Sequence, residues 1–294
     1  MDQATSLREL YIENEVSLPN SYANEGIVIL VTSGKGGVGK SLLTVNLAAS
    51  IGTAENPVLI IDANPRGTHL NMMIGSNPKY RMDDIVSGDV SILDAKDTTL
   101  DGVHLIAGFE ELPVNEIRVK ESEKIVGDNL HRLSHDYSLT LIDCGASRLE
   151  NLEWYSAYST SILMVTTPEI TSITDAYALT KYLYTKAVKD LDMHLLVNQS
   201  RSEKDSRNIA GRFNLMTNNF LNLEVSYAGH IPMSDMVSES VANQSPAVLQ
   251  SGADGLNRLF KKIMNRLYTG EMEKINNVRE VTEYAEPTKI LENL

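Results

Sequence analysis

One short loop constrains the fold of this chain more than any other stretch: VTSGKGGVGKS, residues 31–41. An apolar run, residues 26–33, leads into it, and an apolar helical pattern, residues 41–52, follows it. A strand, a glycine-rich loop and a helix in this order bind phosphate, because backbone N–H groups at the start of the helix point at the phosphate oxygens. The loop therefore predicts a nucleotide-binding α/β fold. A glycine-rich turn without a ligand is the alternative.

The spacing within the loop assigns roles to its side chains. The pattern G-x-x-x-x-G-K-[ST] predicts that Lys40 reaches the β and γ phosphates and that Ser41 ligates Mg²⁺. The residues expected to contact the nucleotide are Gly34, Lys35, Gly36, Gly37, Val38, Gly39, Lys40 and Ser41. One lysine is enough for this motif, so Lys35 needs a separate explanation.

Seven short apolar runs recur along the chain, with stretches long enough for helices between them. They cover residues 26–33, 57–62, 103–108, 137–144, 160–167, 193–200 and 225–232. Near-continuous apolar strands alternating with helices predict a mostly parallel, twisted sheet covered by helices on both faces. We expect one such domain over residues 26–268, an N-terminal helix and linker over residues 1–25, and an acidic tail over residues 269–294.

Composition narrows the possible functions. The 294 residues carry 26 basic and 39 acidic side chains, a net charge of −13, so we expect no nucleic-acid binding. The single cysteine, Cys144, excludes an intrachain disulfide framework and any four-cysteine zinc or iron–sulfur site within one chain. The N-terminus has no signal-peptide pattern, and no apolar run is long enough to span a membrane. These features predict a cytoplasmic protein.

The stretch KGGVGKS, residues 35–41, resembles the deviant Walker A family of P-loop NTPases, which includes MinD and ParA. In that family the extra lysine reaches across an ATP-sandwiched dimer to the nucleotide of the partner subunit, much like an arginine finger. The resemblance implies a MinD-like fold, ATP or ADP with Mg²⁺ as ligands, and an ATP-dependent homodimer. It also implies that Lys35 acts in catalysis.

Three further stretches resemble the FlhG family, also called FleN or YlxH, whose members are MinD-like regulators of flagellar number and placement. Two are TTPEITSITDAYALTKYL, residues 166–183, and YAGHIPMSDMVSESVANQSPAV, residues 227–248. The third, DQATSLREL, matches the N-terminal element by which FlhG proteins engage the GTPase FlhF. The matching residues are Asp2, Gln3, Ala4, Leu7 and Arg8. The resemblance implies an FlhF-like partner bound through residues 1–10, with flagellar C-ring or transcription-regulator components as further partners. An N-terminal helix without a partner is the alternative.

Other site residues follow from the ends of the predicted strands. Asp62 and Asp143 lie at the ends of apolar runs, and with Ser41 they are the expected metal-binding residues. The family resemblance makes Asp143 the acid that holds Mg²⁺ through water. A helix-capping aspartate is the alternative for Asp143. The amide of Asn198 suits the N6 and N7 edge of adenine, although a turn asparagine would look the same. Pro232 and Asp235 lie in the stretch that resembles the other adenine wall.

Two departures from the family pattern concern hydrolysis. The family reads approximately D-x-D-x-G after the second strand, but this chain reads DANPRG, so Asn64 stands at the position of the water-activating acid. An asparagine can hydrogen-bond water but cannot accept its proton. Ser147 likewise stands where a switch glycine is expected. We therefore expect nucleotide binding with weak hydrolysis. A scaffold without turnover is one rival function, and a ParA-type DNA-partitioning ATPase, disfavoured by the net charge, is another.

The last helical pattern leaves membrane contact open. Its apolar stripe comprises Leu256, Leu259, Phe260, Ile263, Met264, Leu267 and Tyr268, with basic residues elsewhere on the helix. Such a helix either packs on the sheet or lies on a membrane surface. We expect core packing, because the stripe occupies the place of the last core helix of the family and because the tail carries six acids against three bases. Peripheral contact with the inner face of the cell membrane is the alternative.

Overall fold

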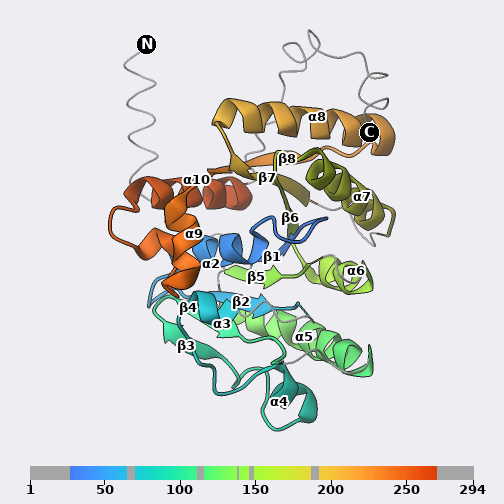
Figure 1. Cartoon of the computed structure of the whole chain (residues 1–294). Coiled ribbons are helices and arrows are strands. Elements are labelled where there is room, and N and C mark those ends of the chain that lie inside the picture. Colours follow the sequence, from blue (N-terminus) through green and yellow to red (C-terminus); the bar gives the residue numbers. More distant parts are fainter. Residues whose placement is uncertain are drawn as a thin grey trace.

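The computed structural model describes residues 27–64, 70–110, 116–137, 139–145, 149–186 and 192–269. In this part of the chain eight strands form one sheet in the order β3-β4-β2-β5-β1-β6-β7-β8 (Figure 1). All paired strands are parallel except β3 and β4. The strands are β1 Ile27–Thr32, β2 Val58–Asp62, β3 Asp97–Leu100, β4 Val103–Ile106, β5 Leu139–Asp143, β6 Ser161–Thr166, β7 Asp192–Ser200 and β8 Ser226–Pro232.

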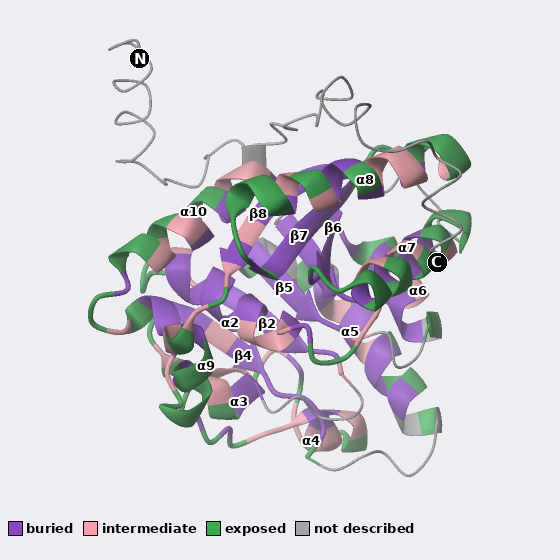
Figure 2. Cartoon of the chain, turned by 45° about the horizontal axis from the view of Figure 1, so that its top comes forward, coloured by how far each residue is buried: buried purple, intermediate pink, exposed green. Residues whose placement is uncertain are grey.

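Helices cover both faces of the sheet. One core cluster packs α5, α6, α7 and α8 against it, and the other packs α2, α3 and α10 against the opposite face. The strands between these layers are almost entirely buried (Figure 2). The helices are α2 Lys40–Ile51, α3 Leu70–Met73, α4 Met82–Ser87, α5 Glu116–Asp136, α6 Leu149–Tyr158, α7 Ile170–Lys186, α8 Glu203–Leu221, α9 Asp235–Ala242 and α10 Asp254–Thr269, with a 3₁₀ turn at Ala247–Leu249. The predicted mostly parallel α/β fold is confirmed.

The strand that the sequence did not predict is β3. Its residues, DTTL, are polar or partly exposed, so they leave no apolar run. It pairs antiparallel with β4 through a two-residue turn at Asp101 and Gly102, where Gly102 has a φ of +74°. Asp-Gly is a favoured hairpin turn because glycine adopts positive φ without strain. This dipeptide was the available signal for the eighth strand.

The apolar stripe of α10 packs in the core. Phe260, Ile263, Met264 and Leu267 are each 5% exposed or less and belong to the cluster that includes α2. The stripe therefore faces the sheet, as expected. Among the described helices none is long and apolar enough to cross a membrane. The predicted N-terminal segment, residues 1–25, lies outside the described residues, as does the predicted acidic tail, residues 269–294, apart from Thr269, which ends α10.

Phe260→Ala tests the packing of α10. Phe260 is fully buried, so the substitution should lower the free energy of unfolding by about 3–5 kcal/mol. Phe220→Ala removes the same side chain from a position that is 62% exposed and should cost about 0.5 kcal/mol or less. Urea denaturation without lipid measures both values. Equal stability of the two variants would mean that Phe260 does not face the core.

Candidate nucleotide-binding site

The register of the sheet brings the two predicted metal-binding acids together. Asp143 at the end of β5 pairs in register with Asp62 on β2 and with Val31 on β1. Both carboxylates are buried, with Asp143 at 0% and Asp62 at 4% exposure. Because the glycine-rich loop follows β1 directly, these acids lie beside it at the carboxyl end of the sheet. This is the edge at which parallel α/β sheets bind ligands.

The carboxylate of Asp143 contacts three side chains from the first five residues of α2. Lys40 Nζ lies 2.5 Å from Asp143 Oδ1, and Ser41 Oγ donates to Asp143 Oδ2 at 2.7 Å. Thr44 Oγ1 adds a longer contact of 3.3 Å to Oδ1. Lys40 is itself only 8% exposed, so its ammonium group is held inside the site. Lys40, Ser41 and Asp143 were predicted from the sequence for this site, whereas Thr44 was not.

The single cysteine adjoins this cluster without contributing reactive chemistry. Cys144 is fully buried beside Asp143. Burial raises the pKa of its thiol far above the ordinary value, and the nearby Lys40 lowers the pKa by less. The thiol therefore stays protonated at neutral pH and is neither a nucleophile nor an anionic ligand.

Two glycines of the loop are required by close packing. A Cβ atom on Gly34 would overlap the backbone of Asp175 on α7. Gly39 has a φ of +85°, and a Cβ there would lie 2.5 Å from the side-chain nitrogen of Asn198. Gly36, in contrast, has no neighbour within 4 Å of such an atom. The loop thus follows the surface of the protein closely at both ends and is open to a ligand in the middle.

Asn198 supports the loop. Its Nδ2 donates to the carbonyl of Val38 at 2.7 Å, and the side chain is 4% exposed. The neighbouring strand places Pro232 opposite Ser200, and Asp235 is the exposed first residue of α9. The structure therefore gives Asn198 a contact with the loop backbone that the sequence did not predict. Its contact with adenine, like those of Pro232 and Asp235, stays a prediction.

Lys35, the additional lysine of the loop, is held by a different partner from Lys40. Lys35 Nζ lies 2.6 Å from Glu169 Oε2 and 3.1 Å from Thr171 Oγ1, at the connection between β6 and α7. This pair is exposed, with 40% exposure for Lys35 and 67% for Glu169. Glu169 follows the β6 strand in the stretch TTPE, so its position at the ligand-binding end of the sheet was the signal that could have identified it.

Asn64 lies next to Gly145, in the loop that follows β5. Its backbone N–H donates to Asp62 Oδ1 at 3.2 Å. A Cβ atom built on Gly145 would lie 3.2 Å from Asn64 Nδ2 and 3.9 Å from Lys40 Cε. Asn64 and Lys40 therefore both lie near Gly145, in the loop that follows β5. Pro65, Arg66 and Ser147, and the partner-binding candidates between Asp2 and Arg8, lie outside the described residues.

The oxygen ligands of the site fit a magnesium ion that binds together with a nucleotide. No group of three or more His, Cys, Asp or Glu side chains that could hold a metal occurs among the described residues. Ser41 Oγ and the carboxylates of Asp62 and Asp143 nevertheless supply oxygen donors of the kind Mg²⁺ prefers. Magnesium is usually held by one or two carboxylates together with water and substrate phosphates. These three residues would complete the site once phosphate oxygens are present.

A parallel sheet, a glycine-rich loop and a buried lysine at the start of the next helix define a P-loop nucleotide-binding protein. The family model for the CobQ/CobB/MinD/ParA nucleotide binding domain matches residues 29–248, and the chain belongs to this family. The match includes all of the loop and both buried acids.

Two similar proteins carry names that are also used for the FlhG family, FleN and YlxH. The antiactivator FleN of Pseudomonas aeruginosa is 29% identical over 227 residues, which are 74% of this chain and 77% of FleN. The flagellum site-determining protein YlxH of Helicobacter pylori is 28% identical over 282 residues, which are 92% of this chain and 93% of YlxH. The resemblance to the FlhG family is therefore confirmed over most of the chain.

Solved structures support the fold. The cell division ATPase MinD of Pyrococcus furiosus has a TM-score of 0.67 at 24% identity and covers 82% of this chain and 98% of its own. MinD of Pyrococcus horikoshii, determined in complex with Mg-ADP, has a TM-score of 0.66 at 22% identity and covers 83% and 96%. At these identities the similarity shows the fold.

Gly34→Ala tests the close packing of the loop on α7. The added methyl group would meet the backbone of Asp175, so unfolding free energy should fall by about 1–3 kcal/mol or more. Gly36→Ala adds the same methyl group where no atom lies within 4 Å and should change stability by about 0.5 kcal/mol or less. Thermal unfolding without nucleotide compares the two. Equal effects would contradict the contact between Gly34 and Asp175.

Proposed function

We propose that this protein is an ATP-dependent dimerising switch of the MinD and FlhG type that regulates flagellar number or placement in the cytoplasm. The observation that carries the proposal is that the two lysines of one loop have different partners and different burial. Lys40 is buried against Asp143, whereas Lys35 is exposed at the rim. The similarity to FleN and YlxH supports the flagellar role. The Mg-ADP complex of a MinD protein of the same fold supports the ligand.

In this proposal Lys40 exchanges partners when nucleotide binds. Its ammonium group leaves Asp143 and binds the β and γ phosphates, while backbone N–H groups of the loop surround them. Ser41 and Asp143, released from their mutual hydrogen bond, would then be the residues that hold the metal through their oxygen atoms. Bound Mg²⁺ supplies neutralisation of the phosphate charge. Asp143 would thus pair with Lys40 before the nucleotide binds and would help to hold Mg²⁺ afterwards.

Lys35 is free to act on a second subunit at small cost. An exposed ion pair such as Lys35–Glu169 contributes about 0–1 kcal/mol. The phosphates of a partner subunit's nucleotide carry more negative charge and more acceptor oxygens than one carboxylate. Lys35 would therefore leave Glu169 and bind them. The proposed homodimer therefore replaces an intrachain contact with one between subunits, and Lys35 senses that the second subunit is present.

Alanine substitutions separate the roles of the two lysines. Lys40→Ala should abolish ATP binding, measured by calorimetry, because it removes the cation of the phosphate site. Lys35→Ala should retain binding but lose ATP-dependent dimerisation, measured by analytical ultracentrifugation. Glu169→Gln should favour the dimer, since it removes the negative charge that pairs with Lys35 without removing the lysine.

Circular dichroism provides the control, since Lys40→Ala leaves the buried Asp143 without its cation. Normal dimerisation of the Lys35→Ala protein with ATP would refute the trans role of Lys35.

The proposed partner is an FlhF-like GTPase that binds residues 1–10. In the DQATSLR element, Gln3 could position the attacking water and Arg8 could stabilise the developing phosphate charge. Flagellar C-ring or transcription-regulator components are further proposed partners of the folded domain. The resemblance of this element to FlhG proteins is what supports the GTPase partner.

A peptide of residues 1–10 should accelerate GTP turnover by an FlhF-type GTPase by an amount that depends on both side chains. The same peptide with Gln3→Ala and Arg8→Ala should give little stimulation, because both groups that act on the transition state are gone. Phosphate release measures both reactions. Equal turnover with and without the natural peptide would exclude this role.

A second candidate function is a nucleotide-binding scaffold with little or no turnover. The observation that favours it is Asn64, whose amide lies beside Gly145 and Lys40 where the family has an acid. An amide cannot take a proton from the attacking water. The ATP-bound state would then last longer than in relatives with aspartate, and the protein would act as a long-lived latch.

Asn64→Asp distinguishes the two candidates. The natural chain should hydrolyse ATP very slowly, since loss of a positioned proton acceptor typically costs about 10²–10⁴ in rate. Asn64→Asp should raise single-turnover hydrolysis at least about tenfold by the same reasoning, with ATP affinity nearly unchanged. The double variant Asn64→Asp with Ser147→Gly tests whether the second loop also limits the rate. Fast hydrolysis by the natural chain would show that another group positions the water.

A further inference from the structure

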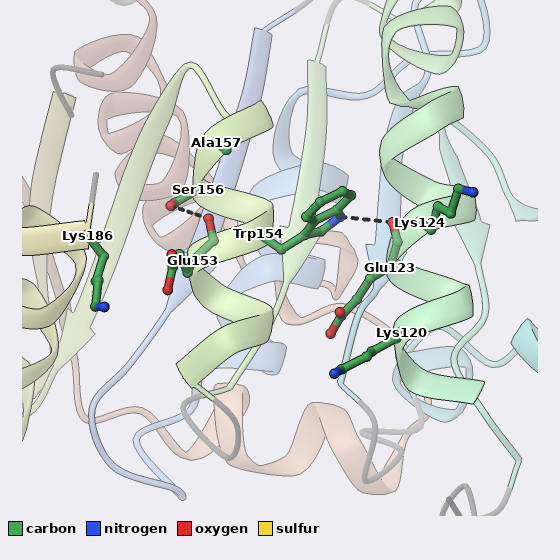
Figure 3. Close-up of a pocket in the computed structure, with 8 residues that line it drawn as sticks. All are labelled: Lys120, Glu123, Lys124, Glu153, Trp154, Ser156, Ala157 and Lys186. Carbon is green, nitrogen blue, oxygen red and sulfur yellow. Dashed lines mark hydrogen bonds between the residues drawn. The ribbon is translucent and has the colours of Figure 1, made fainter. Parts of the chain in front are cut away.

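A groove lies on the helical face of the sheet that is formed by α5, α6 and α7. Its volume is about 640 Å³, and its lining contains none of the predicted nucleotide-binding residues. Trp154 of α6 lies between α6 and α5, with Lys120 and Lys124 on the α5 side, and Lys186 lies on the α7 side of α6 (Figure 3). Glu123, Glu153, Ser156 and Ala157 complete the lining.

Trp154 is fixed in place by the helix beside it. Its Nε1–H donates to the backbone carbonyl of Glu123 at 2.9 Å. A Cβ atom on Gly127 would lie 2.9 Å from the indole ring, so the ring fits only because this helical position is glycine. Glycine inside a helix costs about 1 kcal/mol relative to alanine. The packing of Trp154 against α5 therefore depends on a residue that is unfavourable for the helix itself.

The rim of the groove is positively charged. Lys120, Lys124 and Lys186 are exposed, and within the described part of the chain none of them takes part in an ion pair. Glu153, in contrast, accepts a hydrogen bond from the hydroxyl of Tyr182 at 3.1 Å. Lysines around a tryptophan suit a peptide that carries both acidic and apolar side chains. A polyphosphate suits the groove less well, because it has no apolar group to pack on Trp154.

The start of β1 lies at the end of α6 that forms part of this groove. Thr160, two residues after α6, is hydrogen-bonded to Val28, the second residue of β1, with Thr160 N–H donating to the Val28 carbonyl at 2.7 Å. Ser156 and Ala157 of the groove are in the last turn of α6. The segment that precedes Ile27 therefore joins the folded domain beside the groove.

We propose that the acidic N-terminal segment, residues 1–26, docks into the groove formed by α5, α6 and α7. The segment carries five acids, Asp2, Glu9, Glu13, Glu15 and Glu25, against a single arginine. Apolar residues that suit Trp154, such as Leu10 and Ile12, lie between these acids. The stretch from Glu15 to Ile27 can span up to about 40 Å, which exceeds the length of α6, about 15 Å for its 10 residues. The segment therefore has the charge and the reach to occupy the groove.

The inference goes beyond the proposed function, because it requires neither nucleotide nor a GTPase. Where the proposed function also holds, docking would place residues 1–10 under intramolecular control, and the GTPase would have to compete with the groove for them. The N-terminal segment would then be released by a partner rather than constantly available.

Trp154 is the only tryptophan of the chain, so its fluorescence reports occupation of the groove. The test uses the full chain and measures quenching of this emission by acrylamide. Neutralising Glu9, Glu13 and Glu15 to Gln should lower the docking equilibrium constant about tenfold, which corresponds to about 1.4 kcal/mol. Trp154 should become more accessible to the quencher. The matched control neutralises three acids of the C-terminal segment, Glu271→Gln, Glu273→Gln and Glu280→Gln, and should leave quenching unchanged.

Charge exchange shows whether the contact is direct. Lys120→Glu with Lys124→Glu should expose Trp154, and adding Glu9→Lys with Glu13→Lys should restore its protection. Lys204→Glu, an exposed charge reversal on α8 outside the groove, should have no effect. Unchanged quenching after neutralisation of the N-terminal acids would overturn the proposal. So would an effect of the C-terminal control variant alone, which would assign the groove to residues 270–294, or a failure of the charge exchange to restore protection.

Discussion

The buried ion pair between Lys40 and Asp143 is the interaction on which the nucleotide site depends. It joins the first residue of α2 to the last residue of β5, and it does so where both side chains are almost fully buried. Removing one partner of such a pair typically costs about 3–5 kcal/mol, because an uncompensated charge remains in the interior. The carboxylate therefore holds Lys40 at the start of α2 beside the loop. In the function proposed above, a nucleotide phosphate replaces this carboxylate as the partner of Lys40.

The same loop presents its other lysine under very different energetic conditions. Lys35 is paired with Glu169 at the surface, where solvent weakens the attraction and the pair contributes little to stability. The close approach of Gly34 to the backbone of Asp175 keeps the start of the loop against α7, near Glu169. One lysine is thus fixed by burial and the other is held loosely beside it. This difference gives a physical basis for assigning the two lysines separate roles.

The strands that could be predicted from the sequence are those buried on both faces of the sheet. Seven strands were predicted because a strand buried on both faces must be apolar along its length, whereas β3 was missed because it is polar and partly exposed at the sheet edge. The loop residues followed from their spacing. The contacts of Asn198 with Val38 and of Lys35 with Glu169 could not be predicted, because they join segments 160 and 134 residues apart. Such pairs depend on how the helices pack, which local sequence does not specify.

The two ends of β1 connect the nucleotide site with the groove. The carboxyl end of β1 continues into the glycine-rich loop, and its amino end is hydrogen-bonded to Thr160 just beyond α6. At its other end α6 begins four residues after Gly145, and Asn64 and Lys40 both have atoms close to Gly145. A single ten-residue helix therefore runs from the loop beside Asp143 to the point where the N-terminal segment joins the domain. A displacement of α6 at the nucleotide end would move Trp154 against α5, because the indole is held there by the Glu123 carbonyl and by the space that Gly127 leaves. Helix α7 makes a second connection, because its Lys186 lines the groove while its Thr171 and Asp175 contact the glycine-rich loop.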